Sequence, residues 1–472
     1  MKLRKWQSKC VSLVIKKFKT GKNHVLTLAT PGAGKTFMVS VLAEKLYKKN
    51  EIDLIICFSP NRIVADDFRG TLSEKFNACF EGKIGSLGQS LTYQNLHFLT
   101  SDFWSLFERY RVFVIFDEIH HCRGSNLENA NAWGEKIILN IQDKAKYSIA
   151  LTGTPWRSDA LPIVLSQYCD ATNEIECDYI YGLKNAIADN VCRVPQIIAI
   201  DNDNISVTEN KGKRHYTSFL DLLSQSIFPY SNIIENEQVI SHVVSSANIK
   251  LNELRKINPN AGGLIVASSV AHAAQIQGVL RYSLDERAII VTYREDEPME
   301  LIKKYRNGGD KWIISVGMIS EGTNIPRLQV CCHLTNIKTE MHYRQILGRI
   351  LRVTGSVNQE AIMYMPAEPK LVEFANRVGK DVPTEVSIVK FENMEDKLED
   401  EVLSDFDNEI PLINTNVKCI SAIEINDLGN TRELFEEDDK SPLTESYEKM
   451  IDIFGRFKQE SIELNLFTSE TI

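Results

Sequence analysis

A glycine-rich stretch of the chain reads Ala29-Thr30-Pro31-Gly32-Ala33-Gly34-Lys35-Thr36. It follows an apolar run at residues 25–28 and precedes a helical pattern at residues 37–46, which is the context of a phosphate-binding loop. Glycines allow successive backbone N–H groups to face an anion, and the helix N-terminus adds partial positive charge there. Lys35 can reach the β- and γ-phosphates of a nucleotide, and the Thr36 hydroxyl can ligate Mg²⁺. An ordinary strand-to-helix turn is the alternative, and Gly-Lys-Thr at this junction makes it the less favoured one.

A second signal is a pair of carboxylates that follows a strand. Residues 112–116 are apolar at every position, which is typical of a buried parallel strand, and Asp117 and Glu118 come directly after them. The carboxyl ends of parallel strands deliver catalytic groups to one edge of a sheet. We expect Asp117 to bind Mg²⁺ and Glu118 to orient and deprotonate an attacking water. A helix cap with a solvated face is the alternative.

A third signal is a polar helix face far along the chain. Gln345, Arg349 and Arg352 are spaced by four and three residues, so a helix at residues 343–352 places them on one side. Two guanidinium groups on one face suit the negative charge that develops on a transferring phosphoryl group. A basic, solvated helix face is the alternative, and only the other motifs decide between the two.

Six motifs occur in a fixed order along the chain. They are Arg4-Lys5-Trp6-Gln7, the stretch at residues 29–36, Asp117-Glu118-Ile119-His120, Thr152-Gly153-Thr154-Pro155, Glu321-Gly322-Thr323-Asn324-Ile325-Pro326, and Gln345-x-x-Gly348-Arg349-x-x-Arg352. Together they resemble a superfamily 2 helicase of the DEAD/DEAH-box type, over roughly residues 3–365. The Asp-Glu-x-His box and the residues after Thr154 are similar to those of prokaryotic and phage DNA helicases of this superfamily.

The resemblance implies a role for each matching residue. Nucleotide binding would fall to Arg4, Gln7, Thr30, Pro31, Gly32, Ala33, Gly34, Lys35, Thr36 and Gly322, with Arg4 and Gln7 at the adenine. Gln345 would contact the attacking water or the γ-phosphate, and Arg349 and Arg352 would act as arginine fingers. Coupling between the nucleotide and the nucleic-acid groove would involve His120, Thr152 and Thr154. Asn324 stands where the family often has Asp, so one charge is lost at that corner.

The resemblance also implies contacts with nucleic acid. The candidates are Pro60, Asn61, Arg62, Thr92, Tyr93, Gln94, Arg157 and Ser268. Short polar side chains and backbone amides suit phosphate contacts that ignore sequence, and Tyr93 can stack on a base. Two alternatives stay open, because Tyr93 can equally belong to the core and Ser268 can cap a helix.

Composition is that of an ordinary globular protein. A length of 472 residues predicts two or three domains, and the apolar fraction is 43%. No apolar run reaches the roughly 18 residues that cross a bilayer, and residues 1–9 carry no signal-peptide core. The ten cysteines include no Cys-x-x-Cys pair, which excludes an obvious zinc site and predicts reduced thiols in a cytoplasm. We expect no metal at His120-His121-Cys122, because successive side chains point in different directions.

Charge is unevenly distributed along the chain. The net charge of −9 concerns solubility and steering and does not exclude a local basic groove. Residues 1–49 are markedly basic, whereas residues 392–409 and 436–439 are acidic. We interpret the acidic runs as solvated faces, and we expect nucleic-acid binding to be local, directed at the backbone and weakened by salt.

Alternating strand and helix patterns predict an α/β fold of two tandem RecA-like parallel-sheet domains with a helical bridging segment and a C-terminal appendage. We expect the ATP-binding RecA-like domain at residues 1–170, a linker and helical bridge at 171–258, the second RecA-like domain at 259–390 and an acidic C-terminal extension at 391–472. Predicted strands lie at residues 25–29, 54–58, 113–116, 148–151, 262–267, 288–291, 312–316, 329–334 and 361–365. The polar residues 201–214 read as a loop or insert.

The expected activity is that of an ATP-dependent helicase or translocase, acting on DNA rather than RNA, that hydrolyses ATP with Mg²⁺ at the interface of the two domains. Three alternatives stay open. They are a motor subunit of a repair, restriction or phage-defence complex with a partner such as a nuclease, an RNA helicase, and an ATP-switched interaction module. Nucleic acid is the expected partner, no membrane is expected, and the expected location is the cytoplasm.

Overall fold

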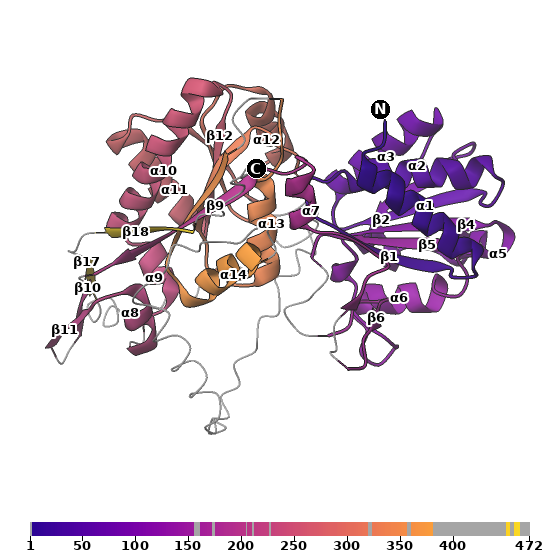
Figure 1. The fold of residues 1–472 in the computed structure, drawn as a ribbon, viewed down its shortest axis with the longest axis horizontal. Helices are drawn as coiled ribbons and strands as arrows, with labels where there is room; N and C mark the ends of the chain where they lie inside the picture. Colours follow the sequence, from indigo (N-terminus) through magenta and orange to yellow (C-terminus); the bar gives the residue numbers. More distant parts are fainter. Residues whose placement is uncertain are drawn as a thin grey trace, which may run out of the picture.

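The computed structural model describes residues 2–154, 161–171, 175–203, 205–209, 212–225, 228–319, 323–355, 360–380, 450–453 and 457–462. These residues form two lobes that lie side by side, each built around a mainly parallel β-sheet (Figure 1). Two regular α/β lobes are what the alternating strand and helix patterns predict.

The first lobe contains a six-stranded sheet in the order β3-β2-β4-β5-β1-β8. All neighbouring strands are parallel. The strands are β1 (His24–Ala29), β2 (Leu54–Ser59), β3 (Gly88–Thr92), β4 (Val112–Asp117), β5 (Tyr147–Thr152) and β8 (Tyr179–Tyr181). The four strands predicted for this part of the chain are therefore confirmed.

Helices cover both faces of the first sheet, which is why β4 and β5 are buried at every position. One face packs under α1 (Lys5–Lys19), α2 (Lys35–Lys48) and α3 (Arg62–Phe76), and the other under η1 (Tyr93–His97) and α6 (Ala132–Asn140). Alternate strand residues serve the two faces: Phe113 and Ile115 belong to one apolar cluster, and Val114 and Phe116 to the other. Shorter elements of this lobe are α4 (Ser101–Trp104), α5 (Leu106–Arg109), η2 (Ile119–His121), β6 (Gln167–Tyr168), β7 (Ile175–Glu176) and α7 (Leu183–Ala188).

The second lobe contains a seven-stranded sheet in the order β13-β14-β12-β15-β16-β9-β18. Its strands are β9 (Val194–Asn202), β12 (Gly262–Ala267), β13 (Ala288–Val291), β14 (Trp312–Ser315), β15 (Leu328–Leu334), β16 (Glu360–Pro366) and β18 (Phe457–Ile462). All are parallel to their neighbours except β18, which pairs antiparallel with β9. The helices are α8 (Phe219–Gln225), α9 (Tyr230–Ile234), α10 (Glu237–Ile257), α11 (Val270–Ser283), α12 (Pro298–Asn307), α13 (Glu340–Ile350) and α14 (Pro369–Lys380). The five strands predicted here are confirmed.

Residues 171–258, predicted as a linker and helical bridge, contribute to both lobes. Strand β8 pairs with β1 in the first sheet, and β9 pairs with β16 in the second. Helix α10 packs against β15, β16 and α11 rather than spanning the lobes. The chain therefore crosses from one sheet to the other within residues 182–193, a much shorter connection than the sequence indicates.

Two further predictions differ from the structure. Residues 201–214, predicted as a loop or insert, include the antiparallel hairpin of β10 (Ile205–Glu209) and β11 (Gly212–Tyr216), with β17 (Met450–Ile453) beside β10. Its described buried apolar residues are Ile205, Val207 and Tyr216, a pattern too short to stand out among polar residues. The described part of residues 391–472, predicted as an acidic C-terminal extension, contains strands β17 and β18, and β18 extends the edge of the second sheet.

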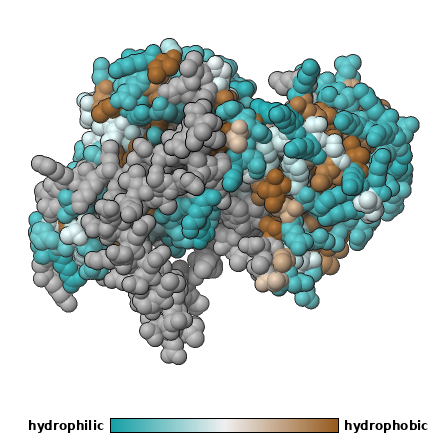
Figure 2. All heavy atoms as spheres, viewed as in Figure 1, coloured by the Kyte–Doolittle hydropathy of each residue, from teal (hydrophilic) through white to brown (hydrophobic). Residues whose placement is uncertain are grey.

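On the face drawn in Figure 2, hydrophilic residues cover most of the first lobe, with scattered patches where apolar residues reach the surface. Within the residues that the structure describes, no helix combines the length and the apolar character needed to cross a bilayer.

Asp178 ties the first lobe together just before β8. Its carboxylate, only 6% exposed, accepts hydrogen bonds from Lys17, from Lys22 at 2.6 Å and from the Leu26 amide of β1 at 2.8 Å. Burial alone would raise the pKa of this carboxyl, but the three hydrogen bonds outweigh it and lower the pKa. The carboxylate therefore joins α1, β1 and the approach to β8.

We predict that Asp178→Asn lowers the thermal unfolding midpoint of the first lobe by about 2–4 °C, corresponding to about 1 kcal/mol for a partly exposed network. Because the folded-state pKa lies below the unfolded value of about 3.9, the stabilisation is present above pH 4 and is lost as the pH falls through the folded-state pKa. The difference between wild type and variant, measured by calorimetry, should thus vanish in acid. Glu300→Gln, at an exposed carboxylate of α12, is the control. An equal shift in both variants contradicts the assignment.

Candidate functional site

The glycine-rich loop connects β1 to α2 and is curled by two glycines. Gly32 and Gly34 have φ angles of +81° and +91°, a left-handed conformation that glycine adopts without strain. Gly34 is the N-cap of α2, so Lys35 is the first residue of the helix. The amide of Thr30 donates to Tyr181 O at 3.0 Å, which anchors the start of the loop to β8. The loop thus places a helix N-terminus and a lysine at one point, as anion binding requires.

Lys35 is paired with Glu118 across the first sheet. Lys35 Nζ lies 2.7 Å from Glu118 Oε1, and the other carboxylate oxygen accepts from the Gly153 amide at 3.1 Å. Glu118 has a φ of +47°, which places it in the left-handed region. A residue other than glycine adopts this backbone conformation at a cost of about 1–3 kcal/mol. Backbone strain of this kind clusters at functional sites. The two predicted catalytic groups are therefore in direct contact.

The predicted Mg²⁺ ligands, Thr36 and Asp117, supply a hydroxyl and a carboxylate. Thr36 lies in the first turn of α2, and Asp117 is the buried last residue of β4. Hard oxygen donors of this kind suit Mg²⁺, which usually takes one or two protein ligands and completes its shell with phosphate and water. Among the described residues no group of three or more His, Cys, Asp or Glu side chains could hold a metal by itself. The donor set thus fits Mg²⁺ bound together with a nucleotide.

Arg4 and Gln7, predicted to read the adenine, hold the loop in this structure. Arg4 Nη1 donates to Ala33 O at 2.8 Å, and Gln7 Nε2 donates to Gly34 O at 2.9 Å. Gln7 Oε1 in turn accepts from the Arg4 amide at 2.8 Å. The start of α1 is therefore fastened to the end of the loop, and adenine recognition by these two residues stays a prediction.

The three predicted coupling residues form a hydrogen-bonded chain behind Glu118. His120 is buried, and its Nδ1 lies 3.0 Å from Thr152 Oγ1 and 3.5 Å from Glu118 Oε2. Thr152 Oγ1 donates to Thr154 O at 2.9 Å and accepts from the Thr154 amide at 3.1 Å. The chain links the carboxyl ends of β4 and β5, so a movement of Glu118 has a direct route to the neighbouring strand.

The arginines of the second lobe lie at the C-terminal end of α13. Gln345 and Arg349 are buried residues of the helix, and Arg349 Nη1 donates to Thr323 O at 2.7 Å. Arg352 lies just beyond the helix end, which the sequence placed later, and donates to the side chain of Asn324. Burial, reinforced by the nearby Arg349, lowers the pKa of Arg352 to about 9.

The two lobes meet where α13 packs on the glycine-rich loop. A Cβ atom placed on Gly348 would lie 2.8 Å from Pro31 Cβ, and one placed on Gly32 would lie 3.1 Å from Arg352 Cγ. The backbone of α13 therefore touches Pro31, and the stem of Arg352 runs along the loop. The structure brings together the predicted residues of both lobes, while Gly322 lies outside the described residues and cannot be placed.

The predicted nucleic-acid contacts divide into two groups. Arg62 is exposed at the start of α3, and Asn61 caps this helix by accepting a hydrogen bond from the Val64 amide. Pro60 is buried, and Gln94, in η1, is half-buried. Others are occupied within the protein: Thr92 Oγ1 donates to Asn95, and Ser268 Oγ donates to Glu235 at 2.9 Å and contacts His272. Arg157 lies outside the described residues.

Tyr93 belongs to the core, which is the alternative to base stacking. Its ring is fully buried and stacks on Trp133 with the centroids 5.8 Å apart. Its hydroxyl donates to Asp117 O at 2.8 Å. A ring enclosed in this way cannot stack on a base, so the residue supports the end of β4 instead. Its position after a strand gave no signal that would separate the two interpretations.

Comparison with known proteins gives the same picture. Residues 1–157 match the family model described as the res subunit of type III restriction enzymes. An uncharacterized protein of Mycobacterium leprae (strain TN) is 26% identical over 396 residues, which are 80% of this chain and 64% of that protein. The DNA 3'-5' translocase XPB2 of Sulfurisphaera tokodaii is 23% identical over 266 residues, 51% of this chain and 55% of that protein. The chain thus spans less than two thirds of the length of these relatives.

A solved structure supports the fold. A fragment assigned as an HsdR subunit of a type I restriction enzyme from Vibrio vulnificus YJ016 superposes with a TM-score of 0.55 at 14% identity, covering 79% of this chain and 65% of that one. The family-model match over residues 1–157 supports the resemblance to superfamily 2 helicases, and the shared fold confirms two parallel-sheet lobes of the RecA-like kind, as the motifs predicted.

We predict that Gly348→Ala separates the lobes, because its Cβ would stand 2.8 Å and 3.0 Å from Pro31 Cβ and Cγ, closer than atoms normally approach. Small-angle scattering should show a larger radius of gyration than for wild type. Gly278→Ala is the matched control, since it lies in α11 with open space around its Cα. It should stabilise the helix by about 0.5–1 kcal/mol without changing the shape. An unchanged radius for Gly348→Ala contradicts close contact in solution.

Proposed function

We propose that this superfamily 2 helicase-like chain hydrolyses ATP between its lobes and uses the cycle to translocate on, or unwind, nucleic acid, with DNA preferred over RNA. One observation carries the proposal. The end of α13 that bears Arg349 and Arg352 packs on the loop that holds Lys35, and Lys35 is paired with Glu118. A cation-lined contact around a paired carboxylate suits a site where phosphate charge is neutralised and a water is activated.

Lys35 Nζ is paired with the Glu118 carboxylate in the structure. A phosphate oxygen of ATP would take the place of the carboxylate at Lys35 Nζ, and the amides of the loop would bind the same phosphates. Glu118 Oε1, released from Lys35, would then accept a proton from the attacking water. The water oxygen forms a bond to the γ-phosphorus as the bond to the β–γ bridging oxygen breaks, which yields ADP and inorganic phosphate.

Charge compensation in this reaction comes from both lobes. Mg²⁺, when bound at Thr36 and Asp117, would neutralise the β- and γ-phosphates. Arg349 and Arg352 would stabilise the charge that spreads over the transferring group, and the lowered pKa of Arg352 reflects how costly its charge is without an anion. Since no single lobe has all of these groups, ATP favours the closed arrangement and its hydrolysis loosens it.

Movement along a nucleic-acid strand requires a binding site for that strand on each lobe. Two helix N-termini occupy equivalent places: Asn61 caps α3 after β2 in the first lobe, and Ser269 caps α11 after β12 in the second. Amides at helix N-termini bind phosphate irrespective of base, and Arg62 adds an exposed cation beside the first of them. An ATP hydrolysis cycle that shifts one lobe against the other would then move one of these binding sites relative to the other. The DNA preference is supported by the Sulfurisphaera relative, which is named as a DNA translocase.

A second candidate function is that of a motor subunit in a larger complex. The match of residues 1–157 to the res subunit of type III restriction enzymes favours it, because that description names one subunit of a nuclease system. In that case the chain supplies movement and a partner supplies cleavage. Purification of the tagged chain from its native cells, followed by mass spectrometry, separates a stable complex from an independent enzyme.

We predict that Lys35→Ala, Glu118→Gln and Arg349→Ala each lower ATP turnover by at least about 10²-fold, because each removes a group that acts on the developing charge or the proton. Steady-state phosphate release in the presence of DNA measures this, and circular dichroism checks that the fold persists. Lys48→Ala, at an exposed lysine of α2, is the control and should retain wild-type turnover. Full activity of Glu118→Gln contradicts its role as the base.

We predict that ATP turnover rises with single-stranded, forked or duplex DNA more than with the corresponding RNA. Arg62→Ala should weaken DNA binding and reduce the slope of log affinity against log salt by about one unit, as expected for one lost phosphate contact. Arg109→Ala is the control, because Arg109 is also exposed but lies just before β4, at the opposite edge of the sheet. Stronger stimulation by RNA overturns the DNA preference, and no stimulation by any nucleic acid overturns the proposed function.

A further inference from the structure

We propose that Arg193, which no motif contains, is a positioning residue that holds the arginine-bearing end of α13 in register with the glycine-rich loop. The proposal rests on the proposed function, because it concerns how Arg349 and Arg352 are aimed at the phosphates. Arg193 lies on the short connection between the two sheets, immediately before β9. Its position makes it a neighbour of both lobes.

The backbone of this connection is bound to the residues that follow α13. The Arg193 amide donates to Leu351 O at 2.7 Å, and Cys192 forms an isolated antiparallel bridge with Arg352. The segment that crosses between the lobes is therefore hydrogen-bonded to the segment that carries the second arginine finger.

The guanidinium of Arg193 extends this attachment to a third segment. Nη1 donates to Leu328 O at 2.5 Å and to Ile350 O at 3.0 Å, and Nη2 lies 3.4 Å from Pro326 O and 3.3 Å from Thr354 Oγ1. The side chain is only 1% exposed. A single rigid, planar group thus fixes the end of α13 against the residues that lead into β15.

Those residues also hold the arginine fingers from the other side. Thr323 O accepts from Arg349, and Asn324 accepts from Arg352, a few residues before Pro326. The fingers are therefore aimed by the segment at residues 323–328, and Arg193 fastens that segment to the helix on which Arg349 lies. Groups that orient functional side chains in this way set their geometry to within a fraction of an ångström.

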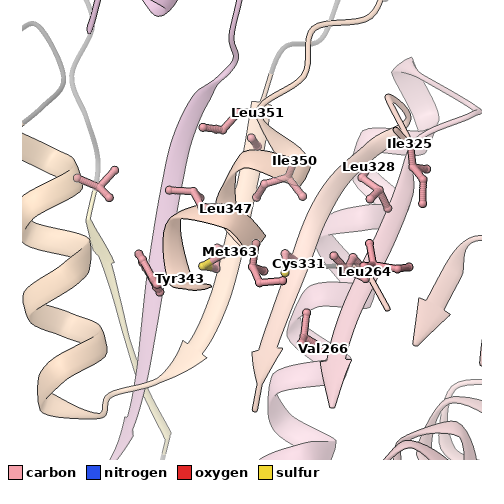
Figure 3. Close-up of a cluster of buried hydrophobic side chains, with 14 of the residues drawn as sticks. Leu264, Val266, Ile325, Leu328, Cys331, Tyr343, Leu347, Ile350, Leu351 and Met363 are labelled. Carbon is pink, nitrogen blue, oxygen red and sulfur yellow. The ribbon is translucent and has the colours of Figure 1, made fainter. Parts of the chain in front are cut away.

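The apolar packing around α13 does not by itself fix the orientation of its C-terminal end, which depends on these hydrogen bonds. Figure 3 shows Leu347, Ile350 and Leu351 gathered with Leu328 and Met363 in the core of the second lobe. Non-directional packing of this kind secures the helix on the sheet but tolerates small rotations and shifts. Directional bonds from a buried guanidinium remove that freedom.

The same connection reaches the glycine-rich loop. Cys192 Sγ lies 3.7 Å from Pro31 O, on the residue that packs against Gly348. Adjacent residues of the connection thus contact the loop of one lobe and the end of α13 in the other. This arrangement sets the loop and the fingers in register without a direct bond between them.

A buried charged group in this place carries a desolvation cost. Within the described part of the chain, no carboxylate pairs with Arg193, and its acceptors are backbone carbonyls and one hydroxyl. Burial lowers the pKa of Arg193 to about 10, so the guanidinium is still charged at neutral pH. A cation at the C-terminus of α13 is stabilised by the helix carbonyls, which offsets part of the desolvation cost.

The experiment compares Arg193→Lys and Arg193→Met with Arg255→Lys in the full chain. Lysine keeps the charge but lacks the planar fork, so it cannot bridge the same acceptors. Arg255 is the matched control, because its guanidinium also donates to backbone carbonyls of the second lobe, Ala261 O and Gly309 O, and within the described residues it donates to none of α13. Three readouts are taken: kcat and KM for ATP with saturating DNA, the thermal midpoint, and hydrogen–deuterium exchange of peptides covering residues 323–330 and 345–355.

We expect Arg193→Lys to lower kcat by about 10- to 100-fold with KM for ATP changed less than about threefold, the pattern of misplaced transition-state contacts. Exchange should accelerate in the peptides at residues 345–355 and 323–330. Arg255→Lys should retain wild-type kcat and exchange there. Should Arg193→Met fail to fold, Arg193→Lys still decides the matter.

Two results overturn the proposal. One is wild-type kcat and exchange in Arg193→Lys, and the other is an equal loss of kcat and thermal midpoint in Arg193→Lys and Arg255→Lys, which indicates a structural role alone. If the wild-type chain hydrolyses no ATP with any nucleic acid, the proposed function fails instead. The exchange comparison then still tests whether Arg193 fixes the end of α13.

Discussion

The packing of α13 directly on the glycine-rich loop is the contact on which the site depends. A side chain at position 348 would hold the lobes apart, whereas Gly348 lets the helix backbone reach Pro31. The stem of Arg352 then runs along Gly32, and Arg349 lies one residue beyond the contact point. In the proposed mechanism, charges from two separate sheets act on one phosphate because of this close approach, since electrostatic stabilisation weakens steeply with distance and with exposure to solvent.

Several cations lie around that contact. Lys35 is satisfied by Glu118, Arg352 by the side chain of Asn324 and Arg193 by backbone carbonyls. Neutral oxygen acceptors compensate a buried guanidinium only in part, which agrees with the lowered pKa values of Arg193 and Arg352. An arriving triphosphate would supply the missing negative charge.

Regular elements and charged motifs were predictable because they have local signatures. All-apolar runs such as residues 112–116 predicted buried strands, and the structure confirms them. Short edge strands were missed, since β8 has three residues and the hairpin at Ile205 and Val207 buries only two apolar side chains of its first strand. Tyr93 shows a further limit, because an aromatic residue after a strand has the same local pattern whether it lies in the core or at the surface.

The order of residues along the chain was sufficient to locate the glycine-rich loop, the Asp117-Glu118 pair and the arginines of α13, because each depends on side-chain chemistry at short spacing. It carried no information on Arg193 or on the contact of Gly348 with Pro31, which join residues more than 130 positions apart in the chain. Such contacts arise only when both sheets have formed and the connection at residues 182–193 has brought them together. The local sequence therefore specifies which residues form the site, and the folded arrangement of the two lobes specifies how those residues are positioned and oriented relative to one another.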